Sequence, residues 1–261
     1  MANFSRFIAL GDSMTEGMCD EIVDGKYRGW ADRVADTLAS EDPNFSYVNL
    51  AIRGKLLTQV VDEQIPAATK YVTGPDTLIS FHAGANDVLR PTYIPELAYA
   101  KYELGISDLA KTSATILVFT VIDRVDGKGR TAQMWHERFS SFNINVRRVA
   151  EKYGAIVIEA DSAKWMADLR FLASDRLHLN PDGHWRLSQA VLEKLDKKSD
   201  ASWKILLPPA PKKSWLRKKS EKLFWIIIFV LPWIWRRLRG KSTGDGRSAK
   251  YETPIAWKPK P

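Results

Sequence analysis

The chain has a single cysteine and four histidines among its 261 residues, and each scarcity excludes a class of protein. Cys19 alone cannot form an intrachain disulfide, which is typical of a cytoplasmic protein. The N-terminus enters a strand-like segment by about residue 6, without the basic and long apolar regions of a secretory signal. The histidines show no metal-binding spacing with other histidines, cysteines or carboxylates. We therefore expect no catalytic metal and no other cofactor.

The sequence also lacks an apolar run long enough to span a membrane. The run from Leu223 to Trp235 holds 13 residues. A bilayer needs roughly 20, and Pro232 would kink any helix here. Basic residues flank the run on both sides. Two interpretations stay open: a helix that lies in the membrane interface, or a helix that packs onto the rest of the fold.

What the sequence does contain begins with Gly11-Asp12-Ser13, which directly follows the apolar run 7–10. A serine on a tight turn between a strand and a helix is exposed at the strand end, where parallel sheets carry their functional groups. Ser13 is therefore a candidate nucleophile. The alternative is a serine that only caps the helix.

Three further segments supply the groups that a nucleophilic serine needs. Gly54 and Asn86 each come after a short apolar run, and Asp175 stands three residues before His178. A histidine can take the serine proton, and a carboxylate against its other ring nitrogen holds the correct tautomer. Backbone N–H groups and an amide side chain can bind the oxyanion that forms when an ester carbonyl is attacked.

In this order the four segments resemble the SGNH (GDSL-type) hydrolase family, whose sequence blocks carry Ser, Gly, Asn and His. The resemblance covers roughly residues 6 to 195, and one departure from the motif is Met14, a packing position where the family has Leu. It implies a hydrolase that cleaves carboxylic esters through an acyl-enzyme. By position it implies Ser13 as nucleophile, His178 as base, Asp175 as the carboxylate that orients it, and Ser13, Gly54 and Asn86 as the oxyanion hole.

Other histidines and two arginines compete for roles in this site. His184, at the expected start of a helix, is the closest alternative to the base. His82 ends a buried-looking strand and His136 lies in a polar stretch, so we expect a core and a surface position for them. Arg53 and Arg90 flank the oxyanion segments and could bind a substrate carboxylate or phosphate, although a structural salt bridge is the commoner role.

Strand-like and helical segments alternate along the first 200 residues. We expect strands at 7–10, 47–50, 77–81, 116–120 and 155–158, and helices at 30–39, 56–68, 94–111, 134–153 and 181–195. This alternation predicts a three-layer α/β/α fold with a mostly parallel five-stranded sheet, of the flavodoxin-like SGNH type. Right-handed crossovers bring the strand C-termini, and the motifs that follow them, to one edge.

The composition changes near residue 200, which we take as the boundary between a catalytic domain (1–200) and a C-terminal helical extension (201–261). The domain holds 24 Lys and Arg against 28 Asp and Glu, a balance of −4, while the extension holds 15 against 3, a balance of +12. Six of the ten tryptophans lie in the extension. Its segments 232–233, 236–240 and 244–247 resemble the extension of a group of actinobacterial SGNH hydrolases.

The apolar and basic extension favours a lipid ester or thioester as substrate, with peripheral contact at the inner face of the membrane through the run from Leu223 to Trp235. Small acetyl esters on carbohydrates are the rival substrates. Nucleic acid is not an expected partner, because a block of Ile and Phe has no use on a phosphate backbone. Outside the enzyme class, the alternative is a membrane-surface binding protein that keeps the fold without turnover.

Overall fold

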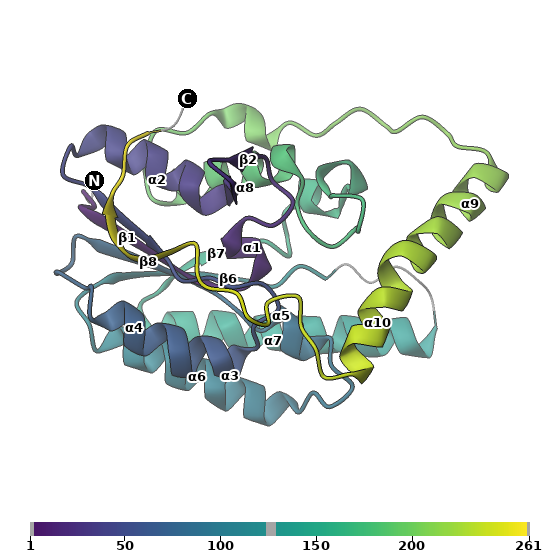
Figure 1. Cartoon of the computed structure of the whole chain (residues 1–261), viewed down its shortest axis with the longest axis horizontal. Coiled ribbons are helices and arrows are strands. Elements are labelled where there is room, and N and C mark those ends of the chain that lie inside the picture. The colour runs from purple at the N-terminus through teal and green to yellow at the C-terminus, as the bar shows by residue number, and fades with distance from the viewer. Residues whose placement is uncertain (1–2, 124–128, 260–261) are drawn as a thin grey trace.

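A six-stranded sheet forms the centre of the computed structural model, which describes residues 3–123 and 129–259 (Figure 1). The strand order is β7-β6-β5-β1-β4-β8. Five of these strands run parallel to their neighbours, and β8 pairs antiparallel with β4. The strands are β1 (Arg6–Gly11), β4 (Ser46–Asn49), β5 (Thr77–His82), β6 (Thr115–Phe119), β7 (Ile156–Ile158) and β8 (Tyr251–Ala256).

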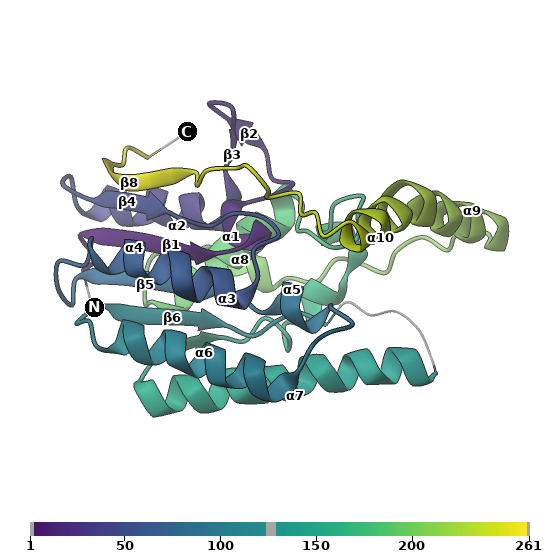
Figure 2. The same ribbon diagram turned by 60° about the horizontal axis from the view of Figure 1, so that its bottom comes forward.

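Helices cover both faces of this sheet (Figure 2). Side chains alternate along β1, so that Phe7 and Ala9 belong to one apolar core while Ile8 and Leu10 belong to the other. One face carries α2 (Gly29–Glu41) and α8 (Pro181–Lys194). The other carries α3 (Leu57–Gln59), a π-helical stretch (Val60–Gln64), α4 (Ile65–Thr69), α6 (Pro95–Ala110) and α7 (Arg130–Tyr153). The predicted three-layer α/β/α class is confirmed.

Short elements stand at the C-terminal ends of two central strands. The four-residue helices α1 (Ser13–Glu16) and α5 (Ala85–Val88) follow β1 and β5 almost directly. A small antiparallel hairpin of β2 (Ile22–Val23) and β3 (Lys26–Tyr27) lies between α1 and α2. The chain leaves β1 for β4 on one side and then crosses back to β5 on the other, so the ends of these three strands form the crevice where α/β sheets bind ligands.

The five predicted strands and five predicted helices are all present, with ends shifted by a few residues. The sheet nevertheless has six strands instead of five, because the extension supplies β8 at its edge. Pro254 lies inside this strand, and a proline argues against a strand in a sequence. It is tolerated here because β8 is an edge strand that hydrogen-bonds on one side only.

Buried side chains hold β8 and its flanks against the domain. Lys250 forms a buried ion pair of 2.8 Å with Asp32 on α2 and donates to the carbonyl oxygen of Tyr27. The indole of Trp257 is buried edge-on against Tyr47, with 4.9 Å between the ring centroids. The C-terminal end of the extension is therefore part of the folded core.

Between the domain and β8, the extension forms one continuous helix, the tail helix (215–238). It consists of α9 (Trp215–Trp225), a π-helical stretch (Ile226–Val230) and α10 (Leu231–Leu238). Pro232 does not end it, since the proline follows the wider π-helical turn and lies in the first turn of α10. Among the described residues, no helix is both long and apolar enough to cross a bilayer.

Candidate active site

The structure brings three of the predicted site residues into hydrogen-bond contact. Ser13 begins α1 at the end of β1, and its Oγ lies 2.9 Å from Nε2 of His178. The other ring nitrogen, Nδ1, lies 2.6 Å from Oδ2 of Asp175. Carboxylate, imidazole and hydroxyl therefore form one relay, in which the ring can accept the serine proton.

The loop that precedes α8 fixes the acidic end of this relay. Oδ1 of Asp175 accepts the backbone N–H groups of Leu177 (2.9 Å) and His178 (3.1 Å), so the carboxylate and the imidazole belong to one tight turn. Burial alone would raise the pKa of Asp175, but the contact with His178 and the two backbone N–H groups hold it below its ordinary value. The carboxylate stays ionised at neutral pH and orients the ring.

Two backbone N–H groups are positioned to bind an oxyanion. Those of Ser13 and Gly54 line the same cavity, and neither donates to an acceptor in the part of the chain that the structure describes. Gly54 has φ +75°, and a Cβ atom there would collide with the hydroxyl of Ser242 in the extension. Only glycine satisfies both the left-handed backbone and this close approach.

The third predicted oxyanion residue, Asn86, lies in the cavity with its amide already engaged. Its Nδ2 donates to Oδ2 of Asp12 (3.0 Å) and to the carbonyl oxygen of Lys55 (3.1 Å). An oxyanion must share one of these N–H groups. Burial raises the pKa of Asp12 to about 6, while the N–H of Met14 and the nearby His178 act in the opposite direction.

A cavity of about 510 Å³ opens above Ser13. The domain lines it with apolar side chains, among them Leu89, Val121, Ile122 and Phe139. The tail helix and the loop after it line the opposite side with Trp225, Phe229, Val230, Trp233, Arg236, Lys241, Ser242 and Thr243. Sequence reasoning left open whether the extension packs on the domain, and it missed that residues of the extension form part of this site.

The model of the GDSL-like lipase/acylhydrolase family matches residues 9–186, a range that includes every predicted site residue. The chain belongs to this family. It is therefore an esterase- or lipase-type hydrolase, and its family domain ends before the extension begins. A search of the curated proteins finds no match.

Solved structures of an α/β hydrolase and of an acetylxylan esterase share the fold at low sequence identity. An α/β-hydrolase enzyme from the metagenome of Lake Arreo in Spain is 18% identical, with a TM-score of 0.61, and the match covers 75% of this chain and 97% of that one. An acetylxylan esterase of Geobacillus stearothermophilus is 17% identical, with a TM-score of 0.59, and the match covers 77% and 100%. At such identities the likeness shows the fold alone.

Arg53 and Arg90, the two arginines beside the oxyanion segments, have different surroundings. Arg53 forms a bidentate salt bridge with Glu16 at the end of α1, and its backbone N–H donates to the same carboxylate at 2.7 Å. Its guanidinium also lies 5.3 Å from the ring centroid of Tyr27. This is the structural role that the sequence favoured. Arg90 does not line the cavity.

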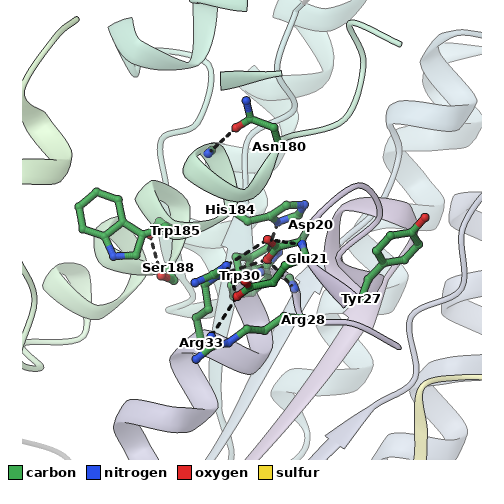
Figure 3. A network of polar contacts seen from close by, with 12 residues as sticks. Asp20, Glu21, Tyr27, Arg28, Trp30, Arg33, Asn180, His184, Trp185 and Ser188 are labelled. Carbon is green, nitrogen blue, oxygen red and sulfur yellow. Dashed lines mark hydrogen bonds and ion pairs between the residues drawn. The ribbon is translucent and has the colours of Figure 1, made fainter. Parts of the chain in front are cut away.

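The remaining histidines lie outside the relay. His184 is fully buried behind α1 and donates through Nε2 to the carbonyl of Met18 (3.1 Å), while Nδ1 accepts the N–H of Trp30 (3.3 Å). Figure 3 shows its ring beside Asp20, whose carboxylate in turn binds Arg33. His136 is exposed and contacts Asp123. His82 lines the cavity floor with its ring against Phe119.

Cys19 lies beside the relay, where its Sγ is 4.0 Å from Oδ2 of Asp175. Together with His178 these residues form the one group within the described ranges that has the geometry of a metal site. Burial and the charge of Asp175 raise the pKa of the Cys19 thiol to about 11. Asp175 and His178 already bind one another. We therefore assign the group to the relay.

The buried neutral ring of His184 predicts an acid-dependent loss of stability. Burial lowers its pKa to about 4 from an ordinary value of 6.5. Between these values the unfolded chain binds a proton that the folded chain does not, so His184 supports folding above pH ~6.5 and ceases to do so as pH falls through 4. We expect a contribution of up to about 3 kcal/mol over this range.

Urea unfolding of wild type and His184→Gln between pH 4 and pH 7.5 measures this contribution. The free energy of unfolding of His184→Gln should vary less steeply with pH than that of wild type by up to one proton equivalent. Identical slopes in the two proteins would show that the ring is protonated equally easily in the folded and unfolded chains.

Proposed function

We propose that this hydrolase cleaves carboxylic esters through an acyl-enzyme in which Ser13 carries the acyl group. The observation that supports it is the continuous relay from Asp175 through His178 to Ser13, with contacts of 2.6 and 2.9 Å, at the floor of an apolar cavity. Both contacts join groups of the chain itself, so the fold holds the three side chains in the geometry that the reaction needs.

In the first half of the reaction, Oγ of Ser13 attacks the ester carbonyl while its proton passes to Nε2 of His178. The ionised Asp175 stabilises the imidazolium that forms. The carbonyl oxygen becomes an oxyanion and accepts hydrogen bonds from the backbone N–H groups of Ser13 and Gly54. It also accepts one from the side-chain amide of Asn86, which already donates to Asp12 and Lys55. Such preorganised donors are each worth about 10² to 10³ in rate.

In the second half, the tetrahedral intermediate collapses and the leaving alcohol takes the proton from His178. Water then attacks the acyl-enzyme, with the same imidazole as base, and the carboxylic acid is released as Ser13 regains its proton. Every proton transfer in this scheme passes through His178, so no group from outside the chain is needed as acid or base. A binding protein without turnover would have no need of the preformed relay.

We also propose that the enzyme rests on the surface of an anionic bilayer through the outer side of the tail helix. Leu223, Ile227, Ile228, Leu231 and Trp235 are 40–60% exposed on this side. Basic clusters of the chain stand before and after them, at 217–219 and 236–239. Apolar side chains between cations suit the boundary between acyl chains and anionic headgroups. A cytoplasmic location, inferred from the lone cysteine, stays a prediction.

The relay predicts how the enzyme responds to the loss of either reacting group. Ser13→Ala and His178→Ala should each lower kcat for p-nitrophenyl acetate by roughly 10³-fold or more, because the two groups act as one unit. For the same reason the double variant should be no slower than the single ones. His136→Ala, which removes an exposed imidazole, is the matched control. Wild-type activity in Ser13→Ala would contradict the proposed nucleophile.

The membrane proposal predicts cosedimentation with phosphatidylglycerol vesicles. The charged pair of substitutions Ile227→Asp and Leu231→Asp should weaken this binding by about tenfold or more, since it places carboxylates at an apolar and anionic surface. Ile144→Asp, at a 63% exposed position on α7, is the control. Equal binding by all three proteins, or equal binding of wild type to phosphatidylcholine vesicles, would count against an electrostatically assisted interface.

A further inference from the structure

The tail helix is apolar on two opposite sides, and its inner side faces the reacting serine. Trp225, Phe229, Val230 and Trp233 line the cavity and are half-buried. The neighbouring positions on the outer side, such as Phe224 at 62% exposed, face solvent. An amphipathic surface helix needs only one apolar face to pack on its domain. The inner side, however, faces a cavity and not a packed core, so its aromatic side chains require an explanation of their own.

Specific contacts fix the tail helix to a segment that carries catalytic residues. The indole Nε1 of Trp225 donates to the backbone carbonyl of Asp175 at 2.8 Å. The guanidinium of Arg176 lies 5.3 Å from the centroid of the same Trp225 ring and reaches the carbonyl of Glu221 at 3.5 Å. These contacts place the inner aromatic side directly beside His178.

A second attachment lies at the oxyanion side of the cavity. The loop after the tail helix passes over Gly54, where the hydroxyl of Ser242 occupies the space of the missing Cβ. From there the chain continues to Lys250 and β8, which are anchored in the core. Figures 1 and 2 show the helix beyond one end of the sheet, with the chain returning from it along the sheet edge to β8. The helix is thus held from both ends of the site.

Apolar side chains lie on both sides of the cavity between the domain and the tail helix, and Arg236, Lys241, Ser242 and Thr243 add a polar part on the side of the extension. The cavity volume of about 510 Å³ is within the range of roughly 300 to 1,000 Å³ that holds small organic ligands. An acetyl group offers one methyl to such a wall. A chain of several carbons removes more apolar surface from water, and each methylene favours binding by about fourfold.

We propose that the inner side of the tail helix, and Phe229 in particular, is the wall that binds an aliphatic chain of the ester, so that this enzyme prefers esters with a chain of several carbons over acetyl esters. The inference rests on the proposed ester hydrolysis. The family match ends at residue 186, so the wall is made by residues that the family domain does not include. Chain-length preference is therefore a property of the extension.

The chain itself offers a matched pair of variants. Phe229→Ala removes a ring from the cavity, and Phe224→Ala removes the same ring from the exposed side of the same helix. The full-length proteins are compared on p-nitrophenyl acetate, butyrate and octanoate, in which the acyl chain varies, and on ethyl and octyl acetate, in which the alcohol chain varies. All esters are kept below their aggregation concentrations and no membrane is added, so the outer side meets only water. Trp233→Ala serves as a second cavity variant, and circular dichroism checks that each variant folds.

The wild-type kcat/KM should rise with chain length in at least one arm of the experiment, the series with varied acyl chains or the series with varied alcohol chains. Phe229→Ala should lower kcat/KM for the longest ester of that arm by about tenfold, which corresponds to the loss of roughly two methylene contacts. For the shortest ester of the same arm, kcat/KM should change by less than about threefold. Phe224→Ala should match wild type throughout. A wild-type preference for the shortest ester in both arms, or equal losses of kcat/KM in Phe229→Ala and Phe224→Ala, would overturn the proposal.

A binding measurement separates this proposal from the proposed hydrolysis. Calorimetric titration of Ser13→Ala with octanoate and with acetate needs no turnover. Octanoate should bind more tightly than acetate, and adding Phe229→Ala should lower the octanoate affinity about tenfold while adding Phe224→Ala should not. This pattern without any ester hydrolysis by wild type would retain the wall and reject the reaction. Ester hydrolysis by wild type without this difference in binding would retain the reaction and reject the wall.

Discussion

The site depends on the convergence of three strand ends at one edge of the sheet. β4, β1 and β5 are neighbours and run parallel, so Gly54, Ser13 and Asn86, which follow them in turn, meet although they are widely separated in the chain. Each group sits on a short segment that leaves a fully buried strand, which leaves it little freedom to move. The loop before α8 then needs only to bring His178 and Asp175 to the same edge.

The extension contacts the domain in two ways. Its last strand and Lys250 join the core, while the tail helix stands over the cavity with little of its own surface covered. A helix so exposed on its outer side gains limited stability from packing, and the indole of Trp225 and the loop at Ser242 hold it in place. The tail helix thus carries an apolar wall on one side and a basic apolar surface on the other, and the wall lies against the turn that holds Asp175 and His178.

The sequence predicted those parts of the site that follow from local rules. Ser13 could be located because it follows an apolar strand, and Asp175 and His178 because their spacing of three suits a single turn, while the roles of Gly54 and Asn86 came from the resemblance to the SGNH family. The alternation of strands and helices likewise predicted the layers. These signals are short-range, and they survive whatever the distant parts of the chain do.

The parts that the sequence did not predict depend on contacts between distant residues. The engagement of the Asn86 amide by Asp12, 74 positions away, has no local signature. The same is true of the approach of Ser242 to Gly54, and of the turning of Phe229 toward the cavity while Phe224 faces water. β8 was missed because it is defined by its pairing with β4 from the other end of the chain, and Pro254 fits a strand only at such an edge.

The central claim is that Ser13 is a nucleophile activated by His178 within this cavity. Its most direct test is to treat the full-length protein with an alkyl fluorophosphonate and to map the adduct by peptide mass spectrometry. The account predicts a single covalent adduct on Ser13 in wild type, and none at the same reagent concentration in His178→Ala. An unmodified protein, or an adduct on another residue such as Cys19, would contradict it.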